Sequence, residues 1–134
     1  MEDVDPKRSE LMRRVRRANT KPELRVRRLL YALGYRYRLH RSDLPGSPDI
    51  VFPSRHKVIF VHGCFWHRHH GCRYATTPKT RSDFWKEKFR QNVERDSRNL
   101  ENLRELGWDP LVLWQCELKD ESRLEARLLS FLGT

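Results

Sequence analysis

The sequence DIVFPSRHKVIFVH, residues 49–62, holds two short apolar runs that decide the fold. Ile50-Val51-Phe52 and Val58-Ile59-Phe60-Val61 are rich in the β-branched and aromatic residues that favour strands. Residues 53–57 between them form a polar connection. We therefore predict a β-hairpin, and a reversal centred at or just before Arg55 makes paired residue numbers sum to about 109 or 110.

Helical patterns lie on both sides of this hairpin. Thr20-Lys21-Pro22-Glu23 is typical of a capping box, with Thr20 as the N-cap and Glu23 reaching back to it. Helices are predicted from there to Gly34 and over 8–17, 83–106 and 120–132, and further strands over 35–39 and 111–114. The order α-α-β-β-β-loop-α-β-α predicts one α/β domain over residues 1–134, a mixed β-sheet flanked by helices.

The net charge of +10 on 134 residues is typical of a protein that binds a polyanion. A solvated basic face without a partner is the alternative. The chain has no run of about 18 apolar residues and no signal-peptide pattern, which favours nucleic acid over a membrane. We expect a cytoplasmic, nucleoid-associated monomer whose residues 1–19 form a basic arm or helix on DNA.

The three cysteines of the chain indicate a metal site. Cys64, His69 and Cys72 fall within nine residues, and Cys116 follows the predicted strand 111–114. Three thiolates and one imidazole are a ligand set that Zn²⁺ accepts in a closed tetrahedral site, which is structural because no position remains for water. His70 is the alternative histidine ligand, and three unrelated buried thiols are the alternative to a metal site.

Asp49 lies at the end of the predicted hairpin where a second cation can bind. The predicted pairing puts it opposite Phe60 or Val61, next to His62. A carboxylate, a main-chain carbonyl and the histidines His62 and His67 would then converge, which suits Mg²⁺ and a water with a neighbouring base. Taken alone, Asp49 is more typical of a turn or a cap than of a metal site.

Several motifs resemble one family of repair enzymes, the very short patch repair endonucleases (Vsr). The resemblance extends from about Met12 to Cys116, and the block HGCFWH at 62–67 is its most specific part. The motifs that carry it are LPGSPD at 44–49, HGCFWH with His69 and Cys72, FWKEK at 84–88, NVERD at 92–96 and LGW at 106–108. It implies a restriction-endonuclease-like fold and nicking of one DNA strand 5′ to the thymine of a T·G mismatch, a product of 5-methylcytosine deamination.

The same resemblance implies roles for individual residues. Asp49 and the Val61 carbonyl would bind catalytic Mg²⁺, His67 would be the base for water, and His62 would support the scissile phosphate. Glu23 would lie near the catalytic centre, and structural Zn²⁺ would be bound by Cys64, His69, Cys72 and Cys116. Phe65 and Trp66 would wedge into DNA beside the mismatch, Met12 would enter from the other groove, and proteins of mismatch repair would be partners.

Alternatives remain for several of these residues. Phe65 and Trp66 also suit a hydrophobic core, Met12 an amphipathic helix and Glu23 a capping box, while Trp85 falls on a helix stripe and suits packing with an additional DNA contact. Val61 stands where the best-known members have threonine. A zinc module that only binds DNA would not need Asp49, His62 and His67, whereas a related nuclease with another DNA target would share them.

Overall fold

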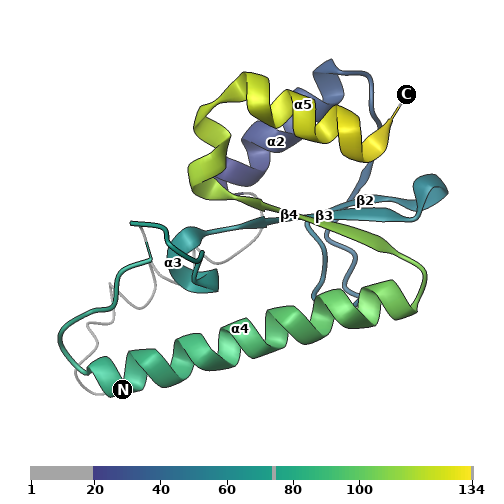
Figure 1. Ribbon diagram of the computed structural model, residues 1–134. Helices are drawn as coiled ribbons and strands as arrows, with labels where there is room; N and C mark the ends of the chain where they lie inside the picture. The colour runs from purple at the N-terminus through teal and green to yellow at the C-terminus, as the bar shows by residue number, and fades with distance from the viewer. Residues whose placement is uncertain (1–19, 74, 134) are drawn as a thin grey trace.

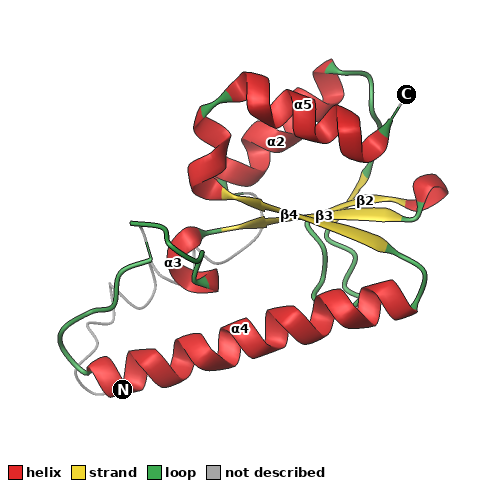
Figure 2. Ribbon diagram, viewed as in Figure 1, coloured by secondary structure: helices red, strands yellow, loops and turns green. Residues whose placement is uncertain are grey.

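The computed structural model describes residues 20–73 and 75–133, so the predicted helix 8–17 lies outside it. The described part is built from helices on both sides of one sheet, as Figures 1 and 2 show. In chain order, the elements are α2 (Lys21–Ala32), β1 (Arg38–Leu39), β2 (Ile50–Phe52), η1 (Pro53–Arg55), β3 (Lys57–His62), α3 (Cys64–His67), α4 (Ser82–Glu105), β4 (Asp109–Trp114), η2 (Gln115–Lys119) and α5 (Glu121–Leu132).

The sheet is mixed, in agreement with the prediction. Its strand order is β1-β2-β3-β4, with antiparallel pairs β1–β2 and β2–β3 and a parallel pair β3–β4. Ile50 pairs with Ile59, so the residue numbers sum to 109 and the predicted hairpin register is confirmed. The long helix α4 connects β3 to β4, as a parallel pair requires.

Each face of the sheet is covered by a different layer of helices. In Figure 1, α2 and α5 lie above the sheet and α4 runs below it. Strand residues alternate between the two cores because successive side chains point to opposite faces. The upper core contains Ile50, Phe52, Ile59 and Leu113 with Leu30, Leu124 and Leu128, and the lower core contains Val51, Val58, Phe60 and Leu103.

Most predicted elements are found, with local differences. The predicted strand 35–39 is reduced to Arg38–Leu39, because Tyr35 packs edge-on against Phe52 and donates its hydroxyl to the Gly133 carbonyl. The capping box is half formed. Thr20 accepts the Glu23 N–H at 3.4 Å, but the Glu23 carboxylate bonds to other side chains. Among residues 20–73 and 75–133, no helix has the length and apolar character needed to cross a membrane.

Candidate active site and metal centre

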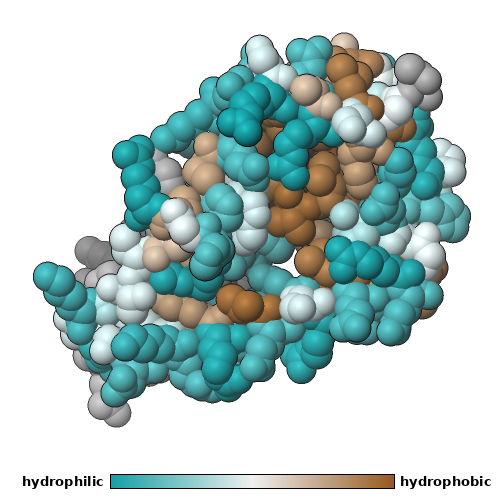
Figure 3. Space-filling view, in the orientation of Figure 1, coloured by the Kyte–Doolittle hydropathy of each residue, from teal (hydrophilic) through white to brown (hydrophobic). Residues whose placement is uncertain are grey.

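A cavity of about 610 Å³ opens between the sheet and the C-terminal half of α4. It is visible in Figure 3 as a hollow above α4. Its lining comes from the loop before β2, the end of β3, α3 and α4, which are distant in sequence. The lining residues are His40, Gly46, Ser47, Asp49, Phe60, Val61, His62, His67, Arg95, Asp96, Asn99 and Leu100.

The turn-rich segment before β2 packs closely against α4 and β3. Gly46 has φ +77, and a Cβ atom built on it would lie 3.0 Å from Asn99 Cβ and 3.1 Å from Phe60 Cε1. Glycine is therefore required at this position both for the left-handed backbone and for the close approach. This packing fixes the wall of the cavity just before Asp49.

Asp49 faces the cavity at the start of β2. Its Oδ2 accepts the main-chain N–H of Val61 at 2.8 Å, so the hairpin brings these two residues together as predicted. Burial raises the pKa of Asp49 to about 6, and the nearby Glu23 charge adds to this shift, while the Val61 hydrogen bond opposes it. A buried carboxyl that resists ionisation is a favourable ligand for a cation, because the positive charge compensates the lost hydration.

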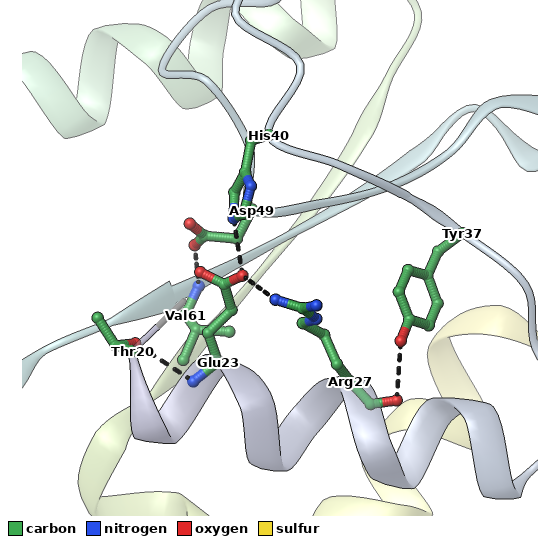
Figure 4. A network of polar contacts seen from close by, with 7 residues as sticks. All are labelled: Thr20, Glu23, Arg27, Tyr37, His40, Asp49 and Val61. Carbon is green, nitrogen blue, oxygen red and sulfur yellow. Dashed lines mark hydrogen bonds and ion pairs between the residues drawn. The ribbon is translucent and has the colours of Figure 1, made fainter. Parts of the chain in front are cut away.

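Glu23 reaches the same region from α2, on the other face of the sheet. Its side chain is 2% exposed, and its Oε2 contacts His40 Nε2 at 2.7 Å and Arg27 Nη1 at 3.2 Å. Figure 4 shows the Glu23 carboxylate directly below that of Asp49. The oxygen or nitrogen atoms that Glu23, His40 and Asp49 offer to a metal lie within 4.8 Å of one another. Sequence reasoning did not identify His40.

His62 and His67, which also line the cavity, form a stacked pair. Their ring centroids are 3.8 Å apart and their planes differ by 7°. Burial, followed by the neighbouring His67, lowers the pKa of His62 to about 3. The His62 Nδ1 atom is buried and has no hydrogen-bond partner among residues 20–73 and 75–133. His62 is therefore a neutral imidazole at physiological pH.

Asp96 orients His67 from α4. Its Oδ2 is 2.6 Å from His67 Nδ1, so the other ring nitrogen of His67 remains for a reaction in the cavity. Sequence reasoning quoted Asp96 within a motif but gave it no role. A signal was present, because Asn92, Asp96 and Asn99 interrupt the apolar stripe of α4 between Phe89 and Leu103.

Arg95 is the one lysine or arginine that lines the cavity in the described part of the chain. Its positive charge lies near enough to His62 to disfavour protonation of that ring. No ion pair engages Arg95 within the described ranges, whereas Arg90 on the same helix is paired with Glu87 and Glu94. An unpaired guanidinium beside a cavity is available to an anionic ligand.

A second cluster lies beyond the ends of two paired strands. The parallel register puts His62 of β3 opposite Trp114 of β4, and one cysteine follows each of these residues by two positions. Cys64, His69, Cys72 and Cys116 therefore converge, with their ligand atoms within 4.8 Å of one another.

The chemistry of this cluster fits Zn²⁺. His69 Nδ1 is 3.2 Å from Cys116 Sγ and 3.8 Å from Cys64 Sγ, and its ring stacks on Trp114 at 4.4 Å. Burial raises the pKa of Cys64 and that of Cys116, so a cation is needed to hold these thiols as thiolates. His70 is exposed and is not part of the cluster, which identifies His69 as the histidine of the set.

The residues expected to contact DNA are described to different extents. Phe65 is half-buried, and its ring packs edge-on against Phe89 at 5.2 Å and Trp85 at 6.2 Å. Trp85 also stacks on Phe89 at 5.7 Å, in agreement with the expected packing role. Met12 and the side chain of Trp66 lie outside the described residues.

Comparisons with known proteins identify the family of the chain. A family model described as "DNA mismatch endonuclease Vsr" matches residues 3–73. The type II nicking enzyme V.XorIIP of Xanthomonas oryzae is 57% identical over 122 residues, covering 91% of this chain and 89% of the relative. The DNA mismatch endonuclease Vsr of Escherichia coli is 43% identical over 132 residues, covering 97% and 84%. The type II nicking enzyme V.NmeAIP of Neisseria meningitidis is 42% identical over 122 residues, covering 91% and 86%.

Proposed function

The chain belongs to the Vsr family of DNA endonucleases, and we propose that it nicks one strand of duplex DNA 5′ to the thymine of a T·G mismatch. The observation that carries this proposal is the convergence of Asp49, His62 and the His67–Asp96 pair in one open cavity. A protein that only binds DNA has no need of a buried carboxyl beside an oriented histidine. Its substrate would arise when 5-methylcytosine deaminates opposite guanine.

The buried carboxyl of Asp49 and the main chain of Val61 suit a Mg²⁺ site. Hard cations take carboxylate and carbonyl oxygens, and the pKa of about 6 for Asp49 indicates a carboxyl that a positive charge would stabilise in its ionised form. A main-chain ligand makes valine as suitable as threonine at position 61. When bound, Mg²⁺ supplies positive charge that stabilises the reacting phosphate and makes water more acidic.

His67 is the residue we assign as the base. Its Nδ1 is held by Asp96, so its Nε2 accepts a proton from the water that attacks phosphorus. The new phosphorus–oxygen bond forms as the bond to the leaving oxygen breaks, and the leaving oxygen takes up a proton from solvent. His62 stays neutral beside it and supports the phosphate through a hydrogen bond.

Arg95 and the aromatic residues of α3 are assigned to DNA binding. The Arg95 guanidinium suits two oxygens of the scissile phosphate, and the net charge of +10 supports attraction of the DNA backbone as a whole. Phe65 and Trp66 would wedge beside the mismatch, where a T·G wobble pair is easier to unstack than a matched pair. Phe65 is half-buried, so it retains surface for such a contact. Met12 and Trp85 would add contacts.

The zinc cluster is assigned a structural role. Four soft or imidazole ligands close a tetrahedral site without a position for water. Bound Zn²⁺ would tie the segment after α3 to η2. This holds α3, and with it Phe65 and His67, in a fixed position beside the cavity.

The names of two relatives favour a second candidate function. V.XorIIP and V.NmeAIP are described as type II nicking enzymes. This chain would then nick with the same residues at a DNA target other than a T·G mismatch.

One experiment distinguishes these candidates. End-labelled duplexes that differ only in a T·G or T·A pair are incubated with the protein in Mg²⁺ or in chelator, alongside Asp49→Ala. We expect a single nick 5′ to thymine, only in Mg²⁺ and only in the T·G strand, and none with the variant. Equal nicking of T·A duplexes would support the second candidate. Cleavage in chelator or by Asp49→Ala would contradict the mechanism.

A further inference from the structure

His40 contacts both residues that carry a buried carboxyl in this region, Glu23 and Asp49. Its ring Nε2 lies 2.7 Å from Glu23 Oε2, and its main-chain N–H donates to the Asp49 carbonyl at 3.1 Å. One residue therefore contacts α2 through its side chain and the start of β2 through its backbone. The side chain is 30% exposed and lines the cavity.

The backbone of His40 adopts a conformation that costs free energy. Its φ is +50, in the left-handed region that residues with a Cβ atom adopt rarely. Such strain persists where the surrounding contacts determine it, and it is frequent at functional sites. Here the backbone bond to Asp49 and the side-chain bond to Glu23 are both made from this conformation.

The contact with Glu23 controls which way a buried carboxylate points. His40 and Arg27 both bond to the same oxygen, Oε2 of Glu23. Figure 4 shows the other oxygen of that carboxylate on the side of Asp49. Two carboxylates this close repel each other, and Glu23 contributes to the raised pKa of Asp49. The donors on Oε2, the Glu23 oxygen farther from Asp49, hold the carboxylate in this orientation.

We propose that His40 is a positioning residue, which holds the Glu23 carboxylate against Asp49 so that both acids act on one divalent cation. This inference rests on the proposed function for the identity of the cation. It makes α2, on the opposite face of the sheet, part of the active site. Arg27 gives Glu23 charge compensation, and His40 gives it direction.

The test uses variants that separate the bond from the fold. His40→Asn tolerates positive φ but is too short to reach Glu23, whereas His40→Gln keeps a donor at nearly the same reach. Tyr37→Phe is the matched control. It removes a hydroxyl that donates to the Arg27 carbonyl at 3.1 Å and leaves both carboxylates untouched. Thermal unfolding checks that each variant is folded. If His40→Asn does not fold, His40→Phe takes its place.

The first readout is binding of Mn²⁺ to the DNA-free protein, followed by the EPR signal of the free ion. We expect Kd to rise about tenfold in His40→Asn, equivalent to about 1.4 kcal/mol. His40→Gln should recover most of this loss, and Tyr37→Phe should bind like the wild type. In the Glu23→Gln background, His40→Asn should add no further loss, because its effect passes through Glu23.

The second readout is nicking of the T·G duplex at saturating DNA. The Mg²⁺ concentration for half-maximal kcat should rise in His40→Asn, with KM for DNA unchanged. Two results would overturn the positioning role. One is that His40→Asn binds Mn²⁺ as tightly as the wild type. The other is that adding His40→Asn to Glu23→Gln weakens Mn²⁺ binding by the same factor as it does in the wild type. A wild-type protein that shows the expected Mn²⁺ results but does not nick T·G would refute the proposed function and leave the role of His40 supported.

Discussion

The imidazole rings of His62 and His67 lie face to face, with centroids 3.8 Å apart and planes that differ by 7°. Two protonated rings at this distance would repel each other, and burial, followed by the neighbouring His67, lowers the pKa of His62 to about 3, which keeps the His62 ring neutral. Asp96 binds only His67, at 2.6 Å. We therefore expect different roles for these two histidines, which are five residues apart.

The His67–Asp96 pair leads to a prediction about the rate of nicking. His67→Ala should lower kcat by about 10² to 10⁴-fold with little change in KM, because a general base acts in the transition state. Asp96→Asn should lower kcat by a smaller factor, because the ring remains but its tautomer is no longer held. Single-turnover nicking of a T·G duplex measures both.

Glu101→Gln is the control for these variants. Glu101 is an exposed acid on the same helix that does not line the cavity. The Glu101→Gln variant should nick at the wild-type rate. If Asp96→Asn also nicks at the wild-type rate, Asp96 has no role in orienting His67.

The raised pKa of Asp49 predicts a cost in stability. Its folded pKa of about 6 lies above the usual 3.8, so its favourable contribution is fully present below about pH 3.8 and is lost as pH rises through 6. Asp49→Asn removes the ionisation. In chelator at pH 7.5, the variant should therefore be more stable than the wild type by about 2 to 3 kcal/mol.

Urea unfolding at several pH values measures this difference. The advantage of Asp49→Asn should shrink toward zero near pH 4, and it should also shrink when Mg²⁺ is added to the wild type at pH 7.5. The same advantage at every pH would show that the ionisation of Asp49 is not its cause.

The proposed zinc site at the Cys₃His cluster predicts a sharp difference between two neighbouring histidines. Cys116→Ser and His69→Ala should each lose bound Zn²⁺ and lower the unfolding temperature, because each removes a ligand that ties two distant segments. His70→Ala should retain one Zn²⁺ per chain, since His70 is exposed and outside the cluster. Metal content by mass spectrometry tests this. Tight zinc binding by Cys116→Ser would refute the assignment.

Arg95 predicts an effect on the chemical step. Arg95→Ala should lower kcat by about 10²-fold, the size found when one preorganised donor to a developing anion is removed. Arg95→Lys should recover part of it, because lysine restores the charge but not the paired donors. Arg98→Ala is the matched control, since Arg98 is exposed on the same helix and does not line the cavity. Equal effects at both positions would show that Arg95 acts only through net charge.

The sequence predicted the parts of the site that depend on short spacing. The hairpin register follows from the two apolar runs and their connection. It put Asp49 opposite Phe60 or Val61, and in the structure Asp49 accepts the Val61 N–H. The ligand set of the metal centre follows from its residue types. Residue types alone do not decide between His69 and His70. That choice depends on which of the two rings the segment after α3 turns toward Cys116.

Other parts of the site depend on contacts that no local pattern contains. Asp96 meets His67 across 29 residues because α4 packs below the sheet. Glu23 was predicted to close a capping box, but its carboxylate turns to His40, 17 residues away. In both cases, a polar side chain pairs with a half-buried histidine that another element supplies.

By itself, the sequence determined most of the strands and helices in the described part of the chain, the hairpin register and the chemical types of the candidate ligands, because periodicity and residue chemistry act over a few positions. Only the tertiary structure decided which distant groups meet. The parallel pairing of His62 with Trp114 brings Cys116 to Cys64, and the packing of α2 and α4 on opposite faces brings Glu23 to Asp49 and Asp96 to His67. These long-range contacts depend on how the whole chain buries its apolar surface on both sides of the sheet.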